Sequence, residues 1–162
     1  MIDQPMRAAA AALLDQLRAH GVTVATAESC TGGLIAATLT EIAGSSDVVD
    51  RGFVTYSNAA KTELLGVPPE LIAAHGAVSE PVARAMAEGA LHRSLARVTV
   101  SVTGVAGPGG GSAEKPVGTV WFGCAVQAGD TVTERHVFPG DRAAIRAAAV
   151  LRAFDLFRRA IV

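Results

Sequence analysis

Apolar and polar residues alternate along this chain with two different spacings, which predict helices and strands in turn. Near the N-terminus, apolar residues recur every three or four positions, which predicts a helix over about Pro5–His20 that ends at Gly21. The apolar stripe of this helix consists of Met6, Ala10, Leu13, Leu14 and Leu17. Val98, Val100 and Val102 instead alternate with polar residues, which is the spacing of a strand.

Cap residues and turn residues delimit the other predicted elements. We expect one helix over about Thr31–Ile42. A second should begin at a cap at Asn58 and end at Gly66 and Pro68-Pro69. Two more should begin after caps at Ser79 and Asp141. The last helix is expected to bury one stripe, made of Ala143, Ala147, Val150, Leu151, Phe154 and Ile161. Strands are expected at Val22–Ala27, Gly52–Ser57, Val117–Val126 and Thr131–Phe138, the last two joined by a Gly129-Asp130 turn.

The order of these elements predicts the fold class. Strands and helices alternate over the first two thirds, and an antiparallel pair of strands follows. We therefore expect one α/β domain over residues 1–162, a three-layer α/β/α sandwich with a mixed sheet. Ligands of such sheets gather beyond the carboxyl ends of strands. Ser29, Tyr56 and the loop from Gly104 each follow a predicted strand, so they form one site if those strands are neighbours.

Composition excludes several classes of function. Half of the 162 residues are apolar and only 4% are aromatic, so Ala, Val and Leu build the core. The net charge is -1 and no basic stripe with stacking aromatics is present, so we expect no nucleic-acid partner. The apolar run Ala8–Leu14 is too short to span a membrane. We expect a soluble protein of the cytoplasm with no membrane partner.

Neither the cysteines nor the histidines suggest a metal or a cofactor. Cys30 and Cys124 fit no disulfide framework and no metal-ligand spacing. The four histidines lie far apart and form no His-Glu-x-x-His pattern. We therefore expect no metal and no cofactor.

The stretch Thr26-Ala-Glu-Ser-Cys-Thr-Gly-Gly33 contains the best candidate nucleophile. It places Ser29 where a short apolar strand turns into a helix, whose unpaired N–H groups are expected to face the same spot. A hydroxyl beside such donors suits attack on a carbonyl or capture of an anion. The alternative is that Ser29 or Thr31 only caps the helix.

Lys61 is the candidate base for Ser29. It lies one turn into the helix after Tyr56 among apolar neighbours, and burial would lower its pKa and supply a neutral amine. Tyr56 could relay or orient the proton. The alternatives are a solvated lysine and a packed tyrosine. Cys30 is a rival nucleophile if a helix N-terminus favours its thiolate, and otherwise a small buried residue.

A glycine-rich loop is the candidate ligand cradle. In Thr103-Gly-Val-Ala-Gly-Pro-Gly-Gly-Gly111 the backbone can approach a ligand closely, although neither a Walker nor a Rossmann pattern is present. The alternative is a flexible surface loop. Arg142 and Arg146, one turn apart, could contact a phosphate or form an ordinary solvated face. Ser112-Ala-Glu-Lys115 has the Ser-x-x-Lys spacing, but no helix is expected there.

Taken together, these stretches resemble the CinA C-terminal domain family, whose characterised members include nicotinamide-nucleotide amidases. The resemblance covers almost the whole chain. The matching stretches are Ala27-Glu-Ser-Cys-Thr-Gly-Gly33, Gly52-Phe-Val-Thr-Tyr-Ser-Asn58 with Lys61, Gly76-Ala-Val-Ser-Glu80, and Thr103–Gly111 continuing through Glu114-Lys-Pro-Val-Gly-Thr-Val-Trp121. Two points differ: Ala113 stands where proline is commoner, and the matching stretches do not include the N-terminal nucleotide-processing domain of larger CinA proteins.

The resemblance implies deamidation of nicotinamide mononucleotide, in pyridine-nucleotide recycling, by a nucleophile Ser29, a base Lys61 and a helper Tyr56. It also implies a substrate pocket that draws on Gly32, Gly33, Thr103, Gly104 and the Gly107-Pro108 loop. We further assign substrate contacts to Arg142 and to the backbone at Cys30 and Thr31. The partner expected is a small nucleotide, and the exposed hairpin edges and Ala-rich helices make a homo-oligomer the expected assembly.

Two other functions stay open at this level. The same glycine loops would serve a non-catalytic nucleotide-binding module linked to competence or DNA recombination, which would not need a neutral Lys61. An amidase acting on a different small amide is the third reading.

Overall fold

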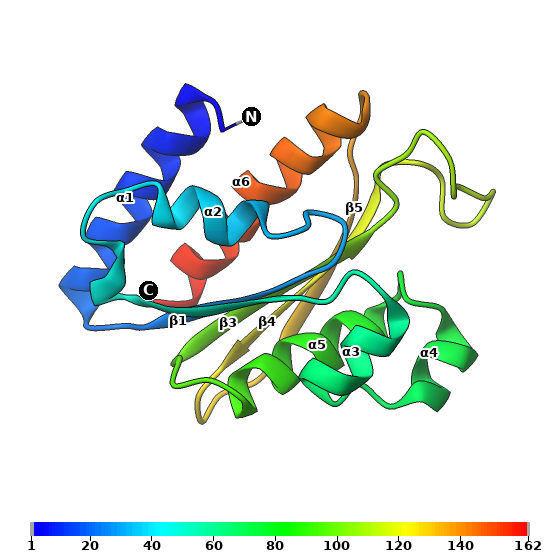
Figure 1. The fold of residues 1–162 in the computed structure, drawn as a ribbon, viewed down its shortest axis with the longest axis horizontal. Helices are drawn as coiled ribbons and strands as arrows, with labels where there is room; N and C mark the ends of the chain where they lie inside the picture. The colour runs from blue at the N-terminus through cyan, green and yellow to red at the C-terminus, as the bar shows by residue number, and fades with distance from the viewer. Residues whose placement is uncertain (1, 162) are drawn as a thin grey trace.

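A mixed five-stranded sheet lies between two layers of helices in the computed structural model, which describes residues 2–161 (Figure 1). The strand order is β2-β1-β3-β4-β5. The strands are β1 (Val24–Glu28), β2 (Val49–Val54), β3 (Val98–Gly104), β4 (Thr119–Val126) and β5 (Val132–Val137). β1 pairs in parallel with β2 and β3, whereas β3–β4 and β4–β5 are antiparallel. The predicted single α/β domain with a mixed sheet is confirmed.

Helices cover both faces of the sheet (Figure 1). One layer contains α1 (Gln4–His20), α2 (Leu34–Thr40) and α6 (Arg142–Ala160). The other contains α3 (Asn58–Leu65), α4 (Pro69–His75) and α5 (Glu80–His92), while a short 3₁₀ turn (Ser45–Asp47) leads into β2. No helix within residues 2–161 is both long and apolar enough to cross a membrane.

The core follows from the burial of the central strands. All five residues of β1 are buried, as are the first six of β3, because helices cover both of their faces. The larger apolar cluster lies between the sheet and α1, α2 and α6, with Leu13, Val100, Phe122 and Phe154 at 0% exposure. A smaller cluster around Met86 lies beneath α5 on the other face. Apolar burial therefore holds the strand ends at fixed positions.

Three predicted elements differ from the structure, and one helix was not predicted. α2 begins at Leu34 rather than near Thr31, and β2 runs over Val49–Val54, earlier than predicted. The cap of α3 is Ser57, whose Oγ accepts from the Ala60 N–H at 3.0 Å, and not Asn58. α4 was not predicted, because a proline pair usually ends helices; here Pro69 stands in the first turn, where its missing N–H costs nothing.

The buried face of α6 was predicted only in part. Val150 and Phe154 are buried, but Ala143 and Leu151 are exposed. Because alanine fits either face of a helix, the Ala-rich sequence did not fix the rotation of α6 about its axis. The other residues that α6 buries are Ile145, Ala149, Ala153, Leu156 and Phe157.

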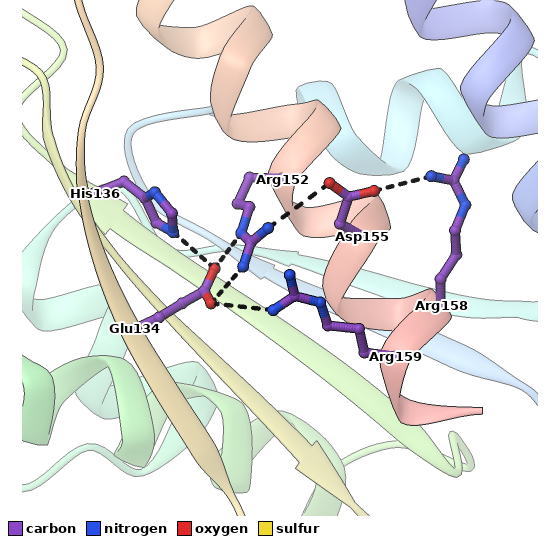
Figure 2. A network of polar contacts seen from close by, with 6 residues as sticks. All are labelled: Glu134, His136, Arg152, Asp155, Arg158 and Arg159. Atoms are coloured by element: carbon purple, nitrogen blue, oxygen red, sulfur yellow. Dashed lines mark hydrogen bonds and ion pairs between the residues drawn. The ribbon is translucent and has the colours of Figure 1, made fainter. Parts of the chain in front are cut away.

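A charged network fixes the second half of α6 to β5 (Figure 2). Glu134 of β5 accepts two hydrogen bonds from the guanidinium of Arg152, one of them from Nη2 at 2.6 Å. His136 Nε2 lies 2.9 Å from the same carboxylate, and Asp155 links Arg152 to Arg158. With its second half fixed in this way, α6 holds its first turns over the carboxyl ends of the parallel strands.

Candidate active site

Three neighbouring parallel strands deliver the predicted residues to one edge of the sheet. Ser29 follows β1, Tyr56 lies two residues beyond β2, and Gly104 ends β3. Since β1 lies between β2 and β3 and all three run in parallel, their carboxyl ends meet. A cleft of 220 Å³ opens there, and the predicted residues that line it are Ser29, Cys30, Tyr56, Lys61, Thr103, Gly104 and Arg142.

Ser29 and Lys61 are in direct contact in this cleft. Lys61 Nζ donates to Ser29 Oγ at 3.0 Å and to the Thr55 carbonyl oxygen at 2.9 Å. The contact arises because α3 begins immediately after β2, so that its first turn points Lys61 back toward the end of β1. The side chain of Lys61 is buried, with 1% exposure.

The surroundings of Lys61 favour its neutral form. Burial lowers the pKa of the Lys61 ammonium, because water no longer solvates the charge. No carboxylate within residues 2–161 forms an ion pair with it. A buried amine beside a hydroxyl can act as a general base.

The buried carboxylate of Glu28 caps α2, a role that sequence reasoning missed. Its Oε1 accepts from the Ile35 N–H and its Oε2 from the Ala36 N–H, both at 2.9 Å, and the side chain has 0% exposure. The prediction that the free N–H groups of this helix face Ser29 is therefore wrong, because Glu28 already binds them. The sequence signal for this cap was an acidic residue directly before a strand-to-helix turn, because a negative charge is favoured at the N-terminus of a helix.

Backbone donors near Ser29 come from the turn that precedes α2. The Gly32 N–H donates to Ser29 O at 3.0 Å and is thus occupied. The N–H groups of Cys30 and Thr31 have no acceptor among residues 2–161. Gly33 closes the turn with φ of 95°, and a Cβ there would lie 3.2 Å from Val54 Cγ2, so the turn requires glycine.

Tyr56 lies at the mouth of the cleft and contacts Arg142 instead of Lys61. Arg142 donates through Nη2 to the Tyr56 hydroxyl at 3.1 Å and through Nη1 to Gly107 O at 2.8 Å. The tyrosine is 62% exposed. The two polar contacts of Lys61 are with Ser29 and Thr55, so a direct Tyr56–Lys61 hydrogen bond is absent within the described chain.

The other predicted substrate residues divide into two groups. Thr103 and Gly104 line the cleft, whereas Thr31, Gly32 and Gly33 form the turn behind Ser29. Pro108, joined to Gly107 by a cis peptide bond, lines a second cleft of 670 Å³ next to the first. Ala106, in the predicted glycine-rich cradle, also lines the first cleft, and the sequence analysis assigned no site role to three further lining residues, Asn58, Ala77 and Val78.

Cys30 is a poor nucleophile in this structure. Burial raises the pKa of its thiol to about 12, so that the thiol stays protonated near neutral pH. The predicted helix N-terminus does not lower this pKa, because Glu28 already caps α2. Among residues 2–161, no group of three or more His, Cys, Asp or Glu side chains is placed to hold a metal ion.

Comparison with known proteins gives consistent results. A family model described as the CinA C-terminal domain matches residues 6–161. Nicotinamide-nucleotide amidohydrolase PncC from Escherichia coli (strain K12) is 56% identical over 139 residues, which are 86% of this chain and 84% of that protein. The protein of the same name from Enterobacter agglomerans is 60% identical over 83% of this chain and 82% of its own length.

A solved structure agrees with the sequence matches. The structure of competence/damage inducible protein CihA from Agrobacterium tumefaciens has a TM-score of 0.95 at 48% identity, and the match covers 98% of this chain and 97% of that one. The family model, the similar sequences and the similar structure all indicate the same family. The chain therefore belongs to the CinA C-terminal domain family.

Proposed function

We propose that this protein hydrolyses the carboxamide of nicotinamide mononucleotide to nicotinic acid mononucleotide and ammonia. The observation that carries the proposal is the 3.0 Å contact between Ser29 Oγ and a buried Lys61 amine that has no carboxylate partner within the described chain. The names of relatives at 56–60% identity support the same substrate. We place the reaction in cytoplasmic pyridine-nucleotide recycling.

The first half of the reaction acylates Ser29. The neutral Lys61 amine accepts the proton of the Ser29 hydroxyl across the 3.0 Å contact while Oγ attacks the carboxamide carbon. The resulting oxyanion needs donors, and the unoccupied N–H groups of Cys30 and Thr31 are the nearest in sequence to Ser29. The Lys61 ammonium then protonates the departing nitrogen, the C–N bond breaks, and ammonia leaves an ester on Ser29.

The second half hydrolyses this ester. Lys61, neutral again, takes a proton from water as the oxygen of that water attacks the ester carbon. The bond to Ser29 Oγ breaks, the serine recovers its proton from Lys61, and the carboxylic acid leaves. Tyr56 and Arg142 hold the substrate at the mouth of the cleft, where they contact each other at 3.1 Å.

Ammonia release from a panel of nicotinamide compounds tests the proposal. We expect release from nicotinamide mononucleotide, little from free nicotinamide, and no change when a chelator is added. If free nicotinamide or another small amide is preferred, the protein is an amidase with a different substrate. Tight binding of the mononucleotide without product would instead identify a non-catalytic nucleotide-binding module.

Substituting Glu28 with glutamine tests how the nucleophile is positioned. The amide keeps one acceptor for α2 and presents an NH₂ group to the other helix N–H, so the turn that carries Ser29 should shift. We expect a fall in kcat of up to about a hundredfold with a much smaller change in KM, since small misplacements reduce rates by that order. The free energy of unfolding should fall by about 1–3 kcal/mol for an unsatisfied buried N–H.

Glu70→Gln is the matched control, because it makes the same change at an exposed position on α4. It should keep the kcat and the melting temperature of the wild type. If Glu28→Gln lowers the melting temperature but leaves kcat unchanged, Glu28 only stabilises α2 and does not position Ser29.

A further inference from the structure

A second cleft lies directly beside the candidate active site. It has a volume of 670 Å³ and is lined by the first turns of α6 and by the loop after β3. Ala106 and Arg142 line both clefts, so the two adjoin at these residues. The first cleft, at 220 Å³, is smaller than most ligand pockets, which hold about 300–1,000 Å³. It can take a carboxamide-bearing ring, but a whole nucleotide needs more room.

Two arginines without acidic partners line the second cleft. Arg142 and Arg146 come from the first two turns of α6. Neither forms an ion pair with any residue in the range 2–161, although seven other arginines there do. Arg142 uses two of its N–H groups on Gly107 and Tyr56, and its others remain available.

Arg146 has an unmet hydrogen-bonding requirement. Its Nη2 donates to Thr31 O at 2.8 Å, but its Nε is buried and has no partner. Two other buried side-chain polar atoms within residues 2–161 share this condition, Thr31 Oγ1 and Thr55 Oγ1. The Thr31 carbonyl contacts Arg146 and the Thr55 carbonyl contacts Lys61, but neither threonine lines either cleft. Buried unsatisfied groups are rare, and within residues 2–161 Arg146 is the one residue with such an atom that lines a cleft.

The charges in this cleft favour an anion. Asp141 is the one acidic residue among the lining residues, and its Oδ1 is already bound to the Ala144 N–H as the cap of α6. The two guanidinium groups and this one carboxylate therefore give the lining of the cleft a net charge of +1. The positive end of the α6 helix dipole lies beside them. Guanidinium groups bind phosphate oxygens through paired N–H donors.

We propose that Arg146, together with Arg142, binds the phosphate monoester of the nucleotide in the second cleft while the carboxamide reaches Ser29 in the first. The inference rests on the proposed function for the identity of the nucleotide. The phosphate-binding residues thus lie on α6, and the glycine-rich loop contributes the wall at Ala106 and Pro108.

Kinetics with and without the phosphate test this subsite. We compare Arg146→Met and Arg146→Lys with the wild type on nicotinamide mononucleotide and on nicotinamide riboside, which lacks the phosphate. In Arg146→Met, kcat/KM for the mononucleotide should fall about ten- to a hundredfold, mainly because KM rises. A loss of this size is expected when hydrogen bonds to a charged group are removed. The riboside should lose less than about threefold, and Arg146→Lys should recover part of the loss.

Binding of ribose 5-phosphate, measured by calorimetry, tests the subsite independently of catalysis. Arg146→Met should weaken it by a similar factor, and Arg97→Ala, at the opposite end of β3, should leave it unchanged. Equal losses on mononucleotide and riboside would show that Arg146 acts only through the Thr31 carbonyl and would overturn the subsite. Unchanged binding of ribose 5-phosphate to Arg146→Met would also overturn the subsite. If the wild type releases no ammonia, the proposed function fails while the calorimetry still decides the subsite.

Discussion

Ser29→Ala should lower ammonia release from nicotinamide mononucleotide by about a thousandfold or more, because losses of that order follow removal of a nucleophile. The change removes the Oγ that accepts from Lys61 at 3.0 Å and leaves the cleft otherwise intact. Affinity for the mononucleotide should therefore persist, measured by calorimetry on the variant. With the wild type, mass spectrometry of a quenched reaction should detect an acyl adduct on the peptide that contains Ser29.

Ser112→Ala is the control for this substitution. Ser112 belongs to the Ser-x-x-Lys sequence that ends at Lys115, but its Oγ only accepts from the Lys115 N–H at 3.1 Å in an exposed turn. This variant should keep the turnover of the wild type. Substantial ammonia release by Ser29→Ala would exclude Ser29 as the nucleophile and would direct attention to an activated water.

The sequence predicted the parts of the site that depend on element order. Ser29, Tyr56 and Gly104 each follow a strand, and strand ends in a parallel sheet meet at one edge. The adjacency of those strands was not predictable, because strand order depends on packing across the sheet. The structure places β1 between β2 and β3, and the Ser29–Lys61 contact follows from that order.

Contacts that depend on side-chain direction were not predictable in the same way. Glu28 and Ser29 are adjacent in sequence, yet the glutamate side chain turns into the helix layer, where the N–H groups of α2 bind it. The Arg142–Tyr56 bond joins residues 86 positions apart and depends on how α6 lies over the strand ends. The rotation of α6 was itself predicted only in part, because its alanines fit either face.

Lys61→Met should reduce turnover about 10²–10⁴-fold, the usual contribution of a general base, with little change in substrate affinity. Methionine has a similar length and no charge, so the buried site should keep its shape. In the wild type, kcat/KM should rise with pH as Lys61 loses its proton, with a midpoint below the pKa of an ordinary lysine, because burial disfavours the ammonium. That rise should be absent from the residual activity of the variant.

The same lowered pKa also predicts how stability depends on pH. Between the pKa of folded Lys61 and that of an unfolded lysine, the unfolded chain carries a proton that the folded chain lacks. The free energy of unfolding must then rise with pH in this window, by up to about 1.4 kcal/mol per pH unit. Below the folded pKa both states are protonated, and the contribution to the slope vanishes.

Denaturant unfolding from about pH 6 to about pH 10 measures this slope, and Lys61→Met should lack it. Lys115→Met is the matched control, because Lys115 is only partly buried and contacts the His75 carbonyl on the surface. It should keep the wild-type slope. Parallel curves for the wild type and Lys61→Met would mean that the folded protein holds this lysine as an ammonium. An ammonium has no lone pair to accept the proton of Ser29, so parallel curves would contradict the base assignment independently of any rate measurement.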